Sequence, residues 1–244
     1  MRLKSVLLFV SAILALNVGV ANANLIKNGG FESTSAGGNK KVNGSFIETD
    51  RTTLTHWVSS EEGTDRGGYN FVLDSAIAHT WDSVLWLEGE NNGYIGSPTK
   101  DSFFASDSQY YPGVLSQLVK GLSIGTTYML TFDYALAQQK NYSGANLDNY
   151  WDVGFGGVYQ ATDYLSIESK GFSGWQTATM YFTATTAEQW LSFLTKGTAP
   201  GSPPFMLLDN VSLEAAVPEP ATWMLMLGGL GLLGFMARRR NTQA

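Results

Sequence analysis

The sequence predicts an all-β protein built around a single antiparallel β-sandwich. Residues 126–134 and 176–184 alternate between large apolar side chains and polar ones, the period-two pattern of half-buried strands. In the second segment Ala178, Met180 and Phe182 share one face. Between residues 24 and 216 no long segment has the helical period of 3.6. Many short strands without helices favour two packed sheets.

Five further strands are expected from short apolar or alternating runs. Turn-forming clusters rich in Gly, Asn and Ser separate them, as at residues 90–93 and 141–144. No convincing internal repeat is present. The expected strands cover residues 83–88, 114–119, 150–155, 189–195 and 205–213.

The N-terminus has the pattern of a secretory signal peptide. Arg2 and Lys4 precede an apolar run over residues 6–16, and Ala21-Asn22-Ala23 supplies the small residues that signal peptidase recognises. The run ends at Asn17, too early for a membrane-spanning helix. We therefore predict export and cleavage by signal peptidase after Ala23.

The C-terminus predicts a membrane-spanning helix preceded by a short motif. As a helix, residues 221–237 would extend roughly 25 Å at about 1.5 Å per residue, slightly less than a hydrocarbon core of about 30 Å. The arginines that follow resist translocation, so we expect them to stay cytoplasmic, as an anchor in the inner membrane. The motif is Val217, Pro218, Glu219 and Pro220, and the arginines are Arg238, Arg239 and Arg240.

This tail closely resembles the PEP-CTERM sorting signal of Gram-negative bacteria. The resemblance covers residues 217–240 and includes the Val-Pro-Glu-Pro box, a Gly-rich apolar segment and a basic end, in that order. It implies recognition and cleavage by an exosortase, followed by delivery to the cell surface or an extracellular matrix associated with exopolysaccharide and biofilm. A plain single-span anchor would explain the hydropathy and the arginines, but not the box.

The predicted organisation is a signal peptide over residues 1–23, one domain over 24–216, the sorting signal over 217–240 and a tail over 241–244. The domain has ten Lys and Arg residues against twenty Asp and Glu, a formal charge of −10. An acidic surface disfavours nucleic acid as a partner. Because cysteine is absent, the domain depends on its core or on a bound ion for stability.

The domain also resembles the galactose-binding-like jelly roll that underlies many carbohydrate-binding modules. Short segments carry the resemblance, among them residues 24–32, 117–122, 125–128, 174–176 and 208–213. It implies a jelly-roll sandwich and an affinity for polysaccharide. In such modules a calcium ion ties the first strand to the last, and Glu32 and Asp209 match the acidic positions.

The position of Asp209 on the last expected strand bears on how its carboxylate is compensated. If it shares an inward face with Leu207, Val211 and Leu213, its carboxylate is buried and needs donors or a cation. Oxygen ligands suit Ca²⁺, which we expect as a structural ion held by Glu32 and Asp209. The alternative is that Asp209 accepts hydrogen bonds from backbone amides and Glu32 lies on the surface.

A sugar-binding face needs aromatic rings that stack on the apolar faces of sugars, with polar groups nearby. The sequence offers several rings, most of which a domain of this size would place in its core. Trp81 and the pair Tyr110-Tyr111 are distinguished by polar or turn-forming neighbours. The candidate sugar-binding residues are Trp81, Tyr110, Tyr111, Trp57 and Trp151.

Catalysis has little support in the sequence. His56 and His79 lack metal-ligand spacing, there is no cysteine nucleophile, and Glu61-Glu62 lie in a polar segment that would solvate them. We therefore expect a non-catalytic protein, exported and processed by exosortase, that associates with exopolysaccharide. A structural matrix protein without a defined ligand and a polysaccharide-modifying enzyme are the alternatives.

Overall fold

The computed structural model describes residues 23–44, 47–61, 68–197 and 203–216, together with Gly228, Gly229 and Gly231. The predicted signal peptide, apart from Ala23, and both the Val217–Pro220 box and Arg238–Arg240 lie outside the described residues. Gly228, Gly229 and Gly231 have helical backbone. No helix in the described part of the chain is long and apolar enough to span a membrane.

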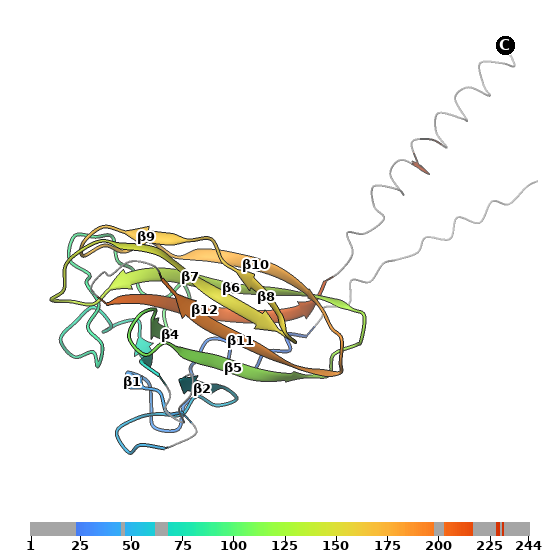
Figure 1. Ribbon diagram of the computed structural model, residues 1–244, viewed down its shortest axis with the longest axis horizontal. Coiled ribbons are helices and arrows are strands. Elements are labelled where there is room, and N and C mark those ends of the chain that lie inside the picture. Colours follow the sequence, from blue (N-terminus) through green and yellow to red (C-terminus); the bar gives the residue numbers. More distant parts are fainter. Residues whose placement is uncertain are drawn as a thin grey trace, which may run out of the picture.

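The domain is a sandwich of two antiparallel sheets, which confirms the predicted all-β class (Figure 1). The first sheet has the strand order β1-β3-β4-β12-β6-β10. The second has the order β2-β5-β11-β7-β8, with β9 also paired to β7. The strands are β1 (Lys40–Lys41), β2 (Val58–Glu61), β3 (Asn70–Asp74), β4 (Ser102–Asp107), β5 (Gly113–Lys120), β6 (Thr127–Gln138), β7 (Asn146–Phe155), β8 (Val158–Ala161), β9 (Leu165–Ile167), β10 (Gln176–Thr183), β11 (Glu188–Lys196) and β12 (Pro204–Ala215).

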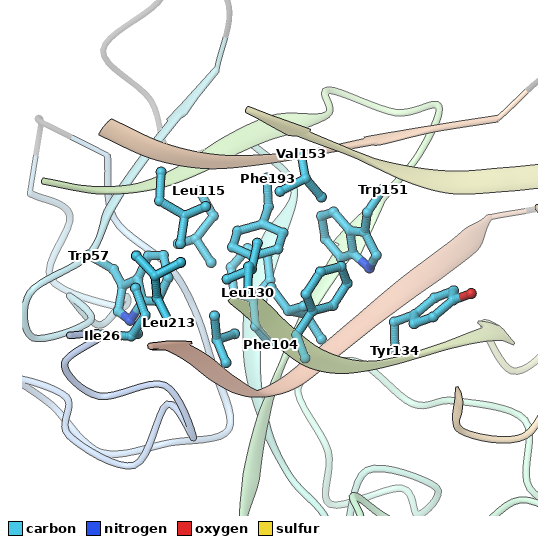
Figure 2. Packing of buried hydrophobic residues seen from close by; sticks show 14 of the residues in the cluster. Ile26, Trp57, Phe104, Leu115, Leu130, Tyr134, Trp151, Val153, Phe193 and Leu213 are labelled. Atoms are coloured by element: carbon cyan, nitrogen blue, oxygen red, sulfur yellow. The ribbon is translucent and has the colours of Figure 1, made fainter. Parts of the chain in front are cut away.

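The main core lies between the two sheets. Figure 2 shows Trp151 and Phe193 from the second sheet meeting Phe104 and Leu130 from the first. The Trp151 and Phe193 rings pack edge to face, with centroids 6.1 Å apart. Four of the expected strands, at residues 114–119, 150–155, 189–195 and 205–213, lie within β5, β7, β11 and β12, and the two alternating segments form most of β6 and β10.

A second apolar core covers the outer face of the first sheet. Side chains of β3, β4, β6 and β12 that point away from the main core meet Leu85 and Leu87 from residues 75–101, the long connection between β3 and β4. These strands are therefore buried on both faces. We call this outer surface of the first sheet the covered face.

The strand predicted at residues 83–88 is wrong. The segment has one isolated bridge, Leu87 to Gln139, and otherwise consists of bends and irregular backbone. Leu85 and Leu87 of this apolar run instead pack face-on against the first sheet. A short apolar run predicts burial and does not by itself require a strand partner.

A β-bulge interrupts β12 and changes the environment of Asp209. Asn210 has φ 52° and the pairing to β6 shifts register between Asp209 and Ser212. Leu207 therefore contributes to the second core while Val211 contributes to the main core. The predicted shared face of Asp209 with Val211 is wrong, because the bulge turns the chain over between them.

Candidate functional site

The second sheet leaves its outer surface uncovered. Along β5 and β11 buried residues alternate with partly exposed ones. We call the outward surface of β2, β5, β11, β7 and β8 the open face. At its centre Ser116, Ser192 and Gly154 are register partners on adjacent strands, so a row of minimal side chains crosses the sheet. Such a row leaves room for a ligand to approach the backbone.

A hollow lies at one end of the open face. Its volume is about 840 Å³, within the range of ligand-binding clefts. Strands β5, β7, β8 and β11 contribute to its walls, together with the loop between β4 and β5. The lining residues are Ser108, Tyr111, Pro112, Val114, Asp152, Tyr159, Leu194, Thr195, Lys196 and Gly197.

Tyr159 on β8 is the main aromatic ring of this hollow. Its ring lies against Gly154, because a Cβ at that glycine would stand 2.7 Å from Tyr159 Cε1 and 2.6 Å from Ser192 Oγ. Only glycine therefore leaves space for the ring to lie across the sheet here. Tyr159 is 65% exposed, so its other side is available for stacking.

Tyr111 contributes the second ring, and a turn built by Asp107 holds it. Asp107 Oδ1 accepts hydrogen bonds from the amides of Gln109 and Tyr110, at 2.8 and 3.0 Å. Tyr110 and Tyr111 then pack edge to face with centroids 4.5 Å apart, and each is more than half exposed. The last residue of β4 thus fixes the start of the loop, and the rings of Tyr110 and Tyr111 lie in contact.

Asp107 itself is buried. Burial raises the pKa of its carboxyl to about 6, although the amides of Tyr110 and Gln109 act in the opposite direction. Its Oδ2 atom has no hydrogen-bond partner among the described residues. The turn that presents Tyr110 and Tyr111 therefore rests on a group whose charge is costly in the folded state.

Polar groups lie beside the rings in the hollow. Asp152 Oδ2 and Lys196 Nζ are 4.0 Å apart and both line it. Ser108 Oγ donates to Asn149 Oδ1 at 2.5 Å, while Thr195 Oγ1 is buried without a partner among the described residues. Of these groups, the Asp152 carboxylate and the Lys196 amine are exposed enough to accept from and donate to ligand hydroxyls. Asp152 is the single carboxylate among the described lining residues.

A smaller hollow of about 280 Å³ lies further along the open face. Trp190 on β11 is 52% exposed and lines it together with Leu118, its register partner on β5. The remaining lining residues are Leu25, Lys27, His56, Val58, Gln117 and Lys120. The open face therefore carries an exposed ring at each of the two hollows described.

Two of the five aromatic candidates are wrong. Trp57 and Trp151 are buried in the main core, where their indole N–H groups donate to the carbonyls of Asn28 and Leu207. They cannot stack on a ligand. Trp81 is 78% exposed, but it belongs to the segment over the covered face and lines none of the hollows described above.

Sequence reasoning missed Tyr159 and Trp190. Trp190 lies in a predicted strand, and a signal was available there, since it alternates out of phase with the buried Leu191 and Phe193. Tyr159 carries no such signal. Its strand is four residues long, and the pairing with Gly154 that positions its ring follows from tertiary register.

The predicted calcium ligands lie on the covered side. The Asp209 carboxylate accepts hydrogen bonds from Ser97 Oγ and Thr99 Oγ1, and burial raises its pKa despite these donors. Glu32 Oε1 accepts from the Ser102 amide at 2.6 Å. The donor set is oxygen, as Ca²⁺ prefers, but no three His, Cys, Asp or Glu side chains of the described residues converge. Protein donors alone already satisfy Asp209, and a bound ion stays a prediction.

Comparison with known proteins adds a match at the C-terminus. Residues 216–240 match the family model described as the PEP-CTERM protein-sorting motif, which confirms the predicted sorting signal. The motif implies export and exosortase-mediated sorting to the surface.

Similarities to whole proteins are more distant. The chain is 28% identical over 221 residues to Halomucin of Haloquadratum walsbyi, which covers 86% of this chain. It spans only 2% of the length of that curated relative.

Among solved structures the chain is similar to TmCBM61, described in complex with beta-1,4-galactotriose. That alignment has 16% identity, covers 80% of this chain and 99% of TmCBM61, and has a TM-score of 0.42. It is also similar to an arabinose-bound α-L-arabinofuranosidase, MgGH51, with 12% identity, 79% and 26% coverage and a TM-score of 0.41. At these identities the alignments show a similarity of fold only.

Proposed function

We propose that this chain is a non-catalytic protein of the bacterial surface or extracellular matrix whose open face binds neutral polysaccharide. The sorting motif at residues 216–240 supports delivery by exosortase to the outside of a Gram-negative cell. A protein held there meets exopolysaccharide at high local concentration. Weak binding at each site is then sufficient for retention.

One observation carries the proposal: exposed aromatic rings lie on a sheet face whose centre is lined by small residues. Tyr159 and Trp190 both rise from this face, on β8 and β11. From strand spacing and residue rise, their Cα atoms are about 12 Å apart. A few linked sugar units cover that distance, so one polysaccharide strand can reach both rings. Ring stacking needs no charge on the ligand, whereas an acidic domain repels uronic acids.

The hollow supports binding more than hydrolysis. Glycosidases generally use two carboxyl groups across the scissile bond. Here Asp152 is the single carboxylate of the described lining residues, and Lys196 is 4.0 Å from it. The polar groups suit hydrogen bonds to sugar hydroxyls, with affinities in the micromolar to millimolar range, on the order of −4 to −8 kcal/mol.

Affinity electrophoresis tests the proposal. The full chain in mild detergent is run through gels containing a soluble β-glucan, a galactan or the exopolysaccharide of its host. We expect retardation in at least one neutral polymer, with no release of reducing ends. Migration equal to that in a polymer-free gel would favour a structural protein without a ligand. Release of reducing ends would mean that the chain is an enzyme.

Processing is tested separately. Intact-mass measurement of the exported protein should give a chain that ends near Val217–Pro220 and lacks Arg238–Arg240. Retention of these arginines would instead indicate a permanent membrane anchor.

A further inference from the structure

Five strands form edges of the two sheets in the described residues, and one of them differs from the rest. β1 has two residues, both lysines, β9 has three residues, and β2 and β8 have four each. Short or charged edge strands are the usual means by which proteins prevent edge-to-edge pairing. β10 is the eight-residue edge strand Gln-Thr-Ala-Thr-Met-Tyr-Phe-Thr, without charge, proline or glycine. It lacks every one of these protections.

The backbone groups that β10 turns outward can be assigned. Ala184, just beyond the strand, donates its N–H to Thr126 O at 2.9 Å, so Ala184 is bonded toward β6. The β10–β6 register runs without a shift over all eight pairs. Alternate residues of an antiparallel strand bond to opposite sides. Thr177, Thr179, Tyr181 and Thr183 therefore direct their N–H and C=O groups away from β6.

Two hydrogen bonds agree with this assignment. Thr127 O, opposite Thr183, accepts from Ala216 N at 2.8 Å, so that residue pair does not bond within the β10–β6 ladder. Gln160 Nε2 donates to Tyr181 O at 2.8 Å from outside the first sheet. In the described part of the chain no strand pairs with the outward side of β10. Gln160 is a single side chain that a ladder could displace.

We propose that two copies of this chain associate by pairing β10 with β10, antiparallel across a two-fold axis. The two six-stranded first sheets then form one continuous sheet. Antiparallel pairing is self-complementary, and this edge is free of charge on a domain whose net charge would otherwise repel a second copy. A register that sets Thr179 opposite Tyr181 of the second copy aligns all four outward residues and gives Thr–Thr and Thr–Tyr pairs, which stabilise sheets.

Sedimentation velocity of the full chain in one mild detergent tests this proposal. Wild type should show a concentration-dependent monomer–dimer equilibrium. Thr179→Lys places a charge on each copy at the seam, and Thr179→Pro removes an N–H that points away from β6, which edge strands tolerate. Both should weaken association at least tenfold. Thr179→Val keeps the backbone donor and should associate as wild type does.

Residues 217–240 are common to all variants, so any association through them is unchanged. Equal association of wild type and Thr179→Lys, or a wild type that is monomeric at every concentration, would overturn the proposal. Melting curves identify a variant that has lost its fold. Thr179→Lys decides the outcome if Thr179→Pro does not fold.

The absence of cysteine provides a second readout. A single Thr179→Cys variant should cross-link to a dimer with a short bis-maleimide. Thr186→Cys, in the exposed turn after β10, should not. Equal yields from the two positions would place the contact elsewhere and contradict the pairing.

Discussion

The outer face of the first sheet is covered by other residues of the chain, whereas the outer face of the second sheet is exposed. Over the first sheet, residues 75–101 bury a second apolar core, so β3, β4, β6 and β12 have no free surface at their centre. Over the second sheet no comparable segment lies across the strands in the described residues, and Tyr159 and Trp190 remain exposed. Burial on both faces contributes stability, while burial on one face leaves a surface that can bind.

Within one sandwich, the buried apolar residues of the covered face therefore stabilise the fold, while the exposed aromatic residues of the open face are available for binding. Leu87 is fully buried on the covered face, and Trp190 is half exposed on the open face. Substitutions at these two positions test whether the two faces differ in this way.

The largest effect is expected in the second core. Leu87→Ala should lower the free energy of unfolding by about 2 to 5 kcal/mol, because it removes buried methyl groups and leaves a cavity. Trp190→Ala, the matched change on the open face, should lower it by less than about 1 kcal/mol. Urea unfolding monitored by circular dichroism measures both. Similar losses would mean that the open face is also part of the folded core.

Bound Ca²⁺ would fasten residues 75–101, which we call the covering segment, to the first sheet. If Ca²⁺ binds at Glu32 and Asp209, stability should rise by about 2.7 kcal/mol at a hundredfold excess over Kd. Asp209 already contacts Ser97 and Thr99 of the covering segment, so the ion would reinforce an existing link. Thermal melts with Ca²⁺ and with chelator should differ, and Asp209→Ala should abolish the difference. Identical wild-type melts would rule out the ion.

Asp107 lies at the end of β4, where the chain passes from the first sheet to the second. Burial raises the pKa of its carboxyl to about 6, above the ordinary value of 3.8. The folded state therefore binds this proton more tightly than the unfolded state. Stability should rise as the pH falls through about 6 and level off near pH 4, where the unfolded state is also protonated.

Asp107→Asn removes the charge and keeps an acceptor for the Gln109 and Tyr110 amides. It should stabilise the protein at pH 7 by on the order of 2 kcal/mol and flatten the pH profile between 4 and 6. Asp82→Asn, at an exposed position on the covering segment, is the control and should change neither. An unchanged profile in Asp107→Asn would mean that another group titrates in this range.

The sequence predicted the class of fold because alternation in β6 and β10 reflects burial directly. It failed at residues 83–88, where a short apolar run belongs to a segment packed over a sheet. It failed at Asp209 because a bulge at Asn210 reverses the facing of β12. It also placed Trp57 and Trp151 among binding residues, although both are buried in the main core and Trp151 alternates in phase with the buried Val153 and Phe155. The contact of Tyr159 with Gly154 depends on a strand pairing that short-range pattern cannot specify.

The central claim is that polysaccharide binds to the open face. Isothermal titration of the full chain with the polymer that retards it most tests this claim directly, using Tyr159→Ala with Trp190→Ala and, as the matched control, Trp81→Ala on the covered side. Loss of a stacked ring costs about 1 kcal/mol or more, so the double variant should bind at least tenfold more weakly while Trp81→Ala binds as wild type. Full affinity in the double variant, or its loss in Trp81→Ala, would contradict the assignment of the open face.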